Sequence, residues 1–250
     1  MRIDNKIFYV LLIVVLLSCA KQQTITITST PEQDFNQALE LLQAKKYNKA
    51  IGTFQNIVFN YPGSSYAADA QFYLADAYYS KKDYQSAIAE FEFFINSFAG
   101  NQNLEEAYYK RAVAYYNIVP AIVKDQTMLS KTLEILDELE ERFPNTHYKQ
   151  EITQLRQKIA DRWAEKSYNT GELYFKGGEY SASRVYFDFV LKEYPQTKWV
   201  NNCKFYIAQI YERTDSLAQA VSLYHTLLSD STDVKIRKLA QEHLTKLEPK

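Results

Sequence analysis

The stretch ADAQFYLADAYYSKKDYQSAIAEFEFF, residues 68–94, carries the pattern that decides the fold. Small and large apolar residues recur in it at steps of three and four, as in Phe72, Ala75, Tyr78, then Ala87, Phe91 and Phe94. Such steps bring side chains to one face of an α-helix. A turn is expected just before Tyr84, so this stretch predicts two amphipathic helices folded against each other.

The same pattern occurs five times, in registers that start at Pro31, Ala68, Glu105, Ala164 and Asn201. The eighth position is always small: Ala38, Ala75, Ala112, Gly171 and Ala208. In the second helix a large residue follows a small or short one by four places, as in Ala50 and Phe54, Ala87 and Phe91, Thr132 and Leu136, Ser183 and Phe187, and Ala220 and Tyr224. Paired helices in a repeat of about 34 residues are the tetratricopeptide pattern.

One helix pair cannot bury its own apolar face, so neighbouring pairs must stack. We therefore expect an all-α fold, a right-handed superhelix of five helix-turn-helix units with a C-terminal capping helix over residues 233–247. A compact helical bundle is the alternative. Between units, the sequences Tyr61-Pro62-Gly63-Ser64, Phe143-Pro144-Asn145-Thr146 and Tyr194-Pro195-Gln196-Thr197 predict that Pro ends one helix and Ser or Thr caps the next.

The N-terminus has the layout of a signal peptide. Two cations, Arg2 and Lys6, lie before an apolar run of 11 residues from Ile7 to Leu17. A run of this length is too short for a bilayer-spanning helix, which needs about 20 residues. It leads into Ser18-Cys19-Ala20, with Leu16 three positions before the cysteine. This arrangement resembles the lipobox of bacterial lipoproteins.

The lipobox resemblance implies that residues 1–18 are removed and that Cys19 is acylated. Three acyl chains make a stable membrane anchor, whereas one chain does not. Ala20, rather than Asp, follows the cysteine, which by the sorting rules of Gram-negative lipoproteins favours the outer membrane, facing the periplasm. An ordinary secretory signal with a chance cysteine, or a short membrane anchor, is the alternative.

Charge excludes one class of partner. Lys and Arg number 29 and Asp and Glu 30, for a net charge of -1, so no positive excess is available for phosphates and nucleic acid is not expected as a partner. Loss of residues 1–18 removes Arg2, Lys6 and Asp4, and leaves 27 minus 29, or -2. The acyl chains, and not the net charge, are therefore expected to hold the protein at the membrane.

Reactive residues are sparse. With Cys19 acylated, Cys203 is alone, and the three histidines are scattered, so no disulfide, metal or other cofactor is expected. Cys203 is expected to pack in a helix near Phe205 and Ile207 as a small apolar residue. The sequence also holds no Gly-rich phosphate loop and no nucleophile at motif spacing from a base. We do not expect an enzyme.

Unit three departs from the repeat in two places. The interval from Tyr115 to Leu129 exceeds that from Tyr78 to Tyr84 by eight residues, 14 against 6, which defines an insertion at residues 117–127. After Pro144, residues 147–175 show helical character with no breaker before Gly171. A helix of about 28 residues would be about 42 Å long and would join the third and fourth units as a rod.

Together these features are similar to the BamD family, the lipoproteins of the outer-membrane β-barrel assembly machinery. The resemblance rests on five tetratricopeptide units behind a lipobox, on Asp125-Gln126-Thr127 in the insertion, and on the sequence ERFPNTHY at residues 141–148. One departure is that many proteobacterial members carry Asn-Arg in the second helix of unit four, where this chain has Val185-Tyr186 preceded by Arg184.

The resemblance implies a scaffold. Units four and five would dock on a periplasmic domain of the barrel subunit BamA, and the N-terminal units would receive segments of unfolded outer-membrane proteins. Other lipoproteins of the machinery are possible partners. The implied parts are a signal peptide (1–18), a lipidated tether (19–30), units one to three (31–146), and the long helix with units four, five and the cap (147–250).

Three sets of candidate contact residues follow. The first helices of units two and three are expected to present a peptide-binding groove formed by Phe72, Asp76, Tyr79, Tyr109, Val113 and Tyr116. Asp125, Gln126 and Thr127 form a candidate partner loop, and Arg184 with Tyr186 a candidate partner contact in unit four.

Each set has a purely structural alternative. The aromatic residues could pack between neighbouring helices, and Thr127 could cap a helix starting near Met128. The acidic residues Asp137, Glu138, Glu140 and Glu141 favour a solvated helix face over a site. A different periplasmic tetratricopeptide lipoprotein, similar to the cell-division coordinator CpoB or to a cell-wall adaptor, is the alternative function. A carbohydrate-binding lipoprotein is a second, although only Trp163 and Trp199 could offer tryptophan platforms.

Overall fold

The computed structural model describes residues 29–119 and 127–248, and within these ranges the chain is helical with no strand. The first three helix pairs are α2 (Pro31–Gln43) with α3 (Tyr47–Asn60), α4 (Ala67–Ser80) with α5 (Tyr84–Ser97), and α6 (Leu104–Ile118) with α7 (Thr127–Arg142). The remaining helices are α8 (Lys149–Lys176), α9 (Tyr180–Glu193), α10 (Val200–Arg213), α11 (Leu217–Asp230) and α12 (Val234–Leu247).

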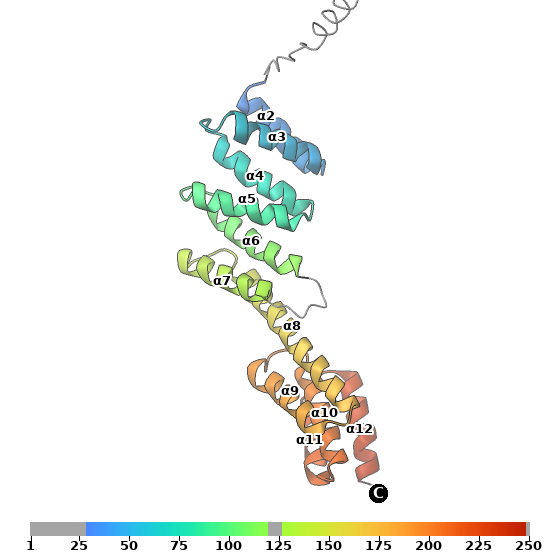
Figure 1. Ribbon diagram of the computed structural model, residues 1–250. Helices are drawn as coiled ribbons and strands as arrows, with labels where there is room; N and C mark the ends of the chain where they lie inside the picture. The colour runs from blue at the N-terminus through green and yellow to red at the C-terminus, as the bar shows by residue number, and fades with distance from the viewer. Residues whose placement is uncertain (1–28, 120–126, 249–250) are drawn as a thin grey trace, which may run out of the picture.

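Successive helices stack on one another as an elongated array (Figure 1). The group α2–α7 lies at one end and the group α9–α12 at the other, and α8 runs from the first group into the second. The predicted all-α tetratricopeptide superhelix is confirmed, with its turns just before Tyr47, Tyr84 and Tyr180 and its capping helix α12.

The core follows the small-and-large pattern of the sequence. The four alanines at the eighth position are fully buried, as are the large residues that follow in the second helices: Phe54, Phe91, Leu136, Phe187 and Tyr224. Unit four is the tightest case, because a Cβ placed on Gly171 would lie 2.7 Å from a ring atom of Phe187. A small residue is therefore needed where these two helices meet.

Helix α8 belongs to two hydrophobic cores. Its first half buries Ile152, Leu155 and Ile159 against units two and three, and its second half buries Ala164, Tyr168 and Gly171 beside α9 and α10. The step from Ile159 to Ala164 is five residues, and at about 100° per residue this turns the buried face toward the other side of the helix. The predicted long helix is confirmed, with bounds Lys149–Lys176.

Contacts from both sides fix the middle of α8. Arg162 lies 4.1 Å from the ring centroid of Tyr116, and its Nη1 donates to the carbonyl oxygens of Tyr116 and Val119 at 3.4 and 3.3 Å. The segment between α9 and α10 also contacts the middle of α8, because Gln157 donates to the carbonyl of Gln196 at 3.2 Å. The centre of the rod is thus held by both helix groups.

The predicted Ser and Thr caps between units are wrong. The helices after these turns begin at Ala67, Lys149 and Val200, and none has a side-chain cap. Ser64, Thr146 and Thr197 instead close the turn itself, because the backbone N–H of each donates to the carbonyl oxygen three residues earlier, at 3.0 to 3.1 Å. The helix then starts three residues further on; the Thr146 hydroxyl accepts from the N–H of Tyr148 at 3.1 Å, before α8 begins, and caps none of its first-turn N–H groups.

Cys203 is fully buried in the core formed by α8, α9 and α10, which confirms that it packs as a small apolar residue. It has no disulfide partner in the described part of the chain. Burial raises the pKa of its thiol to about 12, so the thiol stays protonated at neutral pH. Among the described helices, none combines the length and the apolar character that a membrane crossing requires.

The Gly171 contact gives a test of the packing rule. We expect Gly171→Ala to lower the free energy of unfolding by up to about 2 kcal/mol, since overpacking costs about 1–3 kcal/mol and the helix-propensity gain returns about 1 kcal/mol. Gly52→Ala in α3 is the matched control, because nothing lies within 4 Å of its Cβ position. Urea unfolding should show the control unchanged or more stable; equal effects would contradict the packing rule.

Candidate functional site

A small hollow of about 120 Å³ lies between α6 and the first half of α8. Tyr109, Val113 and Tyr116 line it from α6, and it is completed by Asn117 together with Glu151, Gln154, Leu155 and Lys158. The ring of Tyr109 stacks on that of Tyr148 with centroids 4.4 Å apart, which orients it without burying it. Half of the predicted peptide groove is therefore gathered at one place, and α8 supplies its other wall.

The other three predicted groove residues lie elsewhere. Phe72 is 2% exposed and packs on Phe91 and Phe94, so its assignment to the groove is wrong. The reason is its register position, which points into the contact between helices of the same unit.

Asp76 and Tyr79 belong to a cluster around Lys110. The ammonium of Lys110 binds Asp76 at 2.5 Å and Glu106 at 2.7 Å, and it lies over the ring of Tyr79 at 5.8 Å. Burial alone would lower the pKa of Lys110, but the two carboxylates outweigh it and raise the pKa. Burial also raises the pKa of Tyr79 to about 12, so its hydroxyl remains protonated. Asp76 is thus already neutralised and is not a free acceptor for a peptide.

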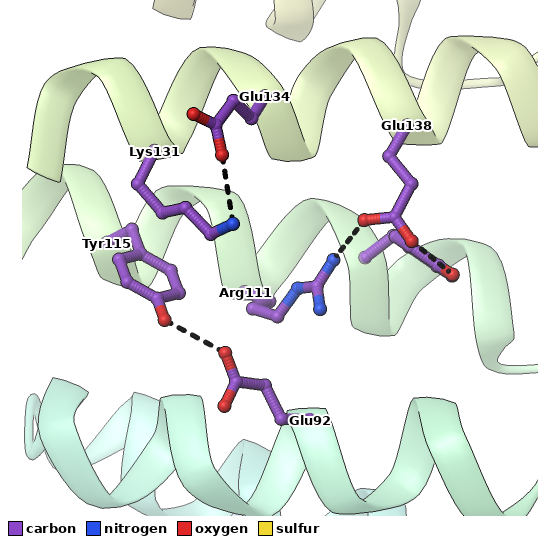
Figure 2. Close-up of polar contacts among 7 residues, drawn as sticks. Glu92, Arg111, Tyr115, Lys131, Glu134 and Glu138 are labelled. Atoms are coloured by element: carbon purple, nitrogen blue, oxygen red, sulfur yellow. Dashed lines mark hydrogen bonds and ion pairs between the residues drawn. The ribbon is translucent and has the colours of Figure 1, made fainter.

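Figure 2 shows a polar network that joins α5, α6 and α7. The buried guanidinium of Arg111 donates to Glu138 at 2.8 Å, and the hydroxyl of Tyr115 donates to Glu92 at 2.8 Å. Burial, together with that hydrogen bond, raises the pKa of Tyr115 to about 12, so the hydroxyl keeps its proton. The Tyr115–Glu92 bond links units two and three, and the Arg111–Glu138 bond links the two helices of unit three. Sequence reasoning missed both, because it followed the small and large apolar positions of the repeat.

The acidic residues of α7 have partners that the predicted solvated face did not include. Glu138 binds Arg111, and Asp137 and Glu140 both bind Arg156 of α8 at 2.6 Å. Of these four acidic residues, only Glu141 has no ion pair within the described ranges. This face is exposed, yet it also fastens α7 to α6 and α8.

The candidate partner loop is only partly described. Asp125 and Gln126 lie outside the described residues, so their assignment stays a prediction. Thr127 is the first residue of α7 and is exposed, so it lies inside the helix rather than before Met128.

A larger groove of about 530 Å³ lies among α9, α10 and α11. Arg184 enters it from α9, paired with Asp188 at 2.8 Å and lying 4.8 Å from the ring centroid of Tyr211. The groove is lined by Arg184, Asp188, Leu191, Lys204, Ile207, Tyr211, Ala218, Gln219, Ser222, Leu223 and Thr226. The lining combines apolar side chains such as Leu191, Ile207 and Leu223 with polar and charged ones, and the cationic Lys204 is among the residues that sequence reasoning missed.

Arg184 and Tyr186 do not form one contact surface. Tyr186 is absent from the groove lining, and its ring stacks on that of Tyr174 at 5.5 Å. Two residues along a helix point to different sides, since the step is about 200°. Beside Tyr186, Val185 and Phe189 are 66% and 45% exposed, which makes an apolar surface next to the groove.

The described residues contain no group of three His, Cys, Asp or Glu side chains that could hold a metal ion. The two grooves and the apolar side chains near them offer shape, ring faces and a few charges. This chemistry suits polypeptide binding.

Comparison with known proteins gives a family. A family model described as "YfiO: Outer membrane lipoprotein" matches residues 28–226, which is well over half of the chain. No curated protein gave a match.

The solved structures that match this chain include tetratricopeptide proteins of low identity. The thermophilic protein TTC0263 of Thermus thermophilus is 15% identical, with 86% of this chain and 99% of that chain covered and a TM-score of 0.38. A tetratricopeptide repeat protein of Parabacteroides merdae is 12% identical, with 86% of each chain covered and a TM-score of 0.39. The TPR2AB domain of yeast Sti1, solved in a complex with pHSP90, is 13% identical, with 86% and 84% covered and a TM-score of 0.47.

The family match spans four complete repeats and most of the fifth. The chain therefore belongs to the YfiO, BamD-like family of outer membrane lipoproteins.

Proposed function

We propose that this protein is a lipid-anchored scaffold of the outer-membrane β-barrel assembly machinery. It binds a BamA-like barrel subunit and segments of unfolded outer-membrane proteins, so that a client and the barrel are held on one molecule. The observation that carries the proposal is the family match over residues 28–226. The two grooves support it, since each offers a protein-binding surface on a different helix group.

The anchor is the acylated Cys19, which places the helices at the periplasmic face of the outer membrane. The cysteine lies at the end of the apolar run, outside the described residues, so the support is the lipobox sequence and the family description. Acyl chains hold a protein on a bilayer without crossing it.

The barrel subunit docks on the C-terminal units, at the groove that contains Arg184. Arg184 lies over the ring of Tyr211 and is paired with Asp188. Its guanidinium can leave Asp188 and bind a carboxylate of the partner instead. The exposed Val185 and Phe189 extend this surface with apolar area. Rings, arginine and apolar side chains together are typical of binding hot spots.

Clients bind at the hollow formed by Tyr109, Val113 and Tyr116. Half-buried tyrosines offer large contact area at low loss of side-chain freedom, and their hydroxyls can satisfy peptide groups. The protein acts by presenting these surfaces, without catalysis and without a cofactor. A cell-division or cell-wall adaptor of the CpoB type is the competing function.

Cys19→Ala tests the anchor. The variant should remain unprocessed or mislocalised, because both cleavage and membrane attachment require acylation of the Cys19 thiol. Membrane fractionation with a protein blot measures it. Normal attachment of the variant to the outer membrane would refute the lipoprotein assignment.

Arg184→Ala tests the docking groove. Loss of this half-buried arginine should weaken binding to the periplasmic domains of the barrel subunit about 10-fold. Arg213→Ala is the matched control, because Arg213 is exposed at the end of α10 and makes no ion pair in the described part of the chain. Pull-down from detergent-solubilised membranes with mass spectrometry measures both; recovery of only Tol-Pal or cell-wall components with the wild type would favour the adaptor function.

Photocrosslinking tests the client site. A photoreactive phenylalanine at Tyr109 or Tyr116 should capture an unfolded outer-membrane barrel protein. Phe93 on α5 is the control position, because its ring is 52% exposed outside the hollow. Equal capture at Phe93 would show that exposed aromatic residues, and not this hollow, attract the client.

A further inference from the structure

Five lysines gather at the turns within the first two units: Lys45, Lys46, Lys49, Lys81 and Lys82, here the lysine patch. All five are exposed, and four of them, Lys82 excepted, line one shallow hollow of about 320 Å³ together with Tyr47 and Asn48. None is ion-paired to any residue within 29–119 or 127–248. The charges are therefore close together and free.

The backbone of these turns disfavours lysine. Lys45 has φ 57° and Lys82 has φ 66°, in the left-handed region that side chains with a Cβ rarely adopt. The equivalent turn of unit four has Gly178 at φ 79°. The equivalent turn of unit five has Asp215 at φ 58°, so this position accepts side chains of different charge, and in the first two units that side chain is a cation.

Nearby carboxylates do not neutralise the patch. The first turn of α3, which contains Lys49, holds no acidic residue. The carboxylate of Asp83, next to Lys82, caps α5 by accepting from the N–H of Ser86 at 3.3 Å. Because the net charge of the chain is -1, this positive concentration is local and the composition conceals it.

The patch lies at the end of the array where the chain enters. Helices α2 and α3 form that end in Figure 1, with α12 at the other. Thr30, the cap of α2, follows Cys19 by 30 minus 19, or 11, positions. Eleven residues span at most about 40 Å when fully extended, and α2 adds about 20 Å. The anchor therefore keeps units one and two near the bilayer, whereas it sets no such limit for units four and five.

We propose that the lysine patch rests on the anionic phospholipid headgroups of the bilayer that holds the anchor, and so sets the angle at which the array leaves the membrane. The inference rests on the lipid anchor of the proposed function and adds a second membrane contact to it. Exposed lysines near an anionic surface each strengthen binding about fivefold, over a distance of about one Debye length. The acyl chains supply attachment, and the lysines supply orientation.

Vesicle flotation tests the patch without the acyl chains. Residues 20–250 retain every described helix and lack Cys19. They should float with vesicles containing about 30 mol% phosphatidylglycerol, fail to float with phosphatidylcholine alone, and lose binding as salt rises above the physiological range.

The test variant is Lys45→Gly, Lys49→Gln, Lys81→Gln and Lys82→Gly. The glycines suit the positive φ angles, so thermal unfolding should show a fold at least as stable, while vesicle partitioning falls by about 100-fold or more. The matched control removes four cations from α12 at the far end: Lys235→Gln, Arg237→Gln, Lys238→Gln and Lys246→Gln. It should keep most of the binding.

Three results would overturn the proposal: no flotation of the wild type, equal loss in the α12 control, or binding to an acidic polypeptide such as polyglutamate with none to anionic vesicles. None of these three results depends on the lipid anchor, which is tested separately by fractionation of Cys19→Ala. An acylated protein that carries the four patch substitutions should still fractionate with the membrane.

Discussion

The structure depends on one helix that two hydrophobic cores share. Helix α8 buries Ile159 in the core of units two and three and Ala164 in the core of the C-terminal units, and the five-residue step between them rotates the buried face by about 140°. Arg162 fixes this midpoint to the end of α6, and Gln157 fixes it to the turn before α10. A continuous helix with contacts on both sides transmits the position of one group to the other.

This constraint ties the two candidate surfaces together. The first half of α8 supplies Leu155 and Lys158 to the hollow beside Tyr109, and its second half packs on α9, which carries Arg184 into the larger groove. A client in the hollow and a barrel subunit in the groove would therefore contact elements joined by the same rod. The lysine patch adds a third fixed point, at the end nearest the anchor.

Sequence periodicity predicts the helices, their turns and the buried small residues, because small residues such as Ala75 and Gly171 are needed where large ones such as Phe72 and Phe187 fill the same core. It could not tell which face of a helix meets a neighbouring unit. Periodicity therefore predicts Phe72 in the groove, whereas it lies in the core, and it predicts one surface for Arg184 and Tyr186, which point to different sides of α9. Contacts between units, such as Tyr115 with Glu92, depend on distances that a register does not contain. The net charge of -1 does not reveal the lysine patch, because acidic residues elsewhere in the chain balance its positive charge.

The rigidity of α8 can be measured directly with spin labels at Asn96 on α5 and Gln241 on α12, both exposed and on different sides of the midpoint. Pulsed electron paramagnetic resonance of the wild type should give one narrow distance distribution. Two glycines inserted after Ala160 should broaden it. A broad or two-peaked distribution in the wild type would contradict the account, because the two helix groups would then move independently.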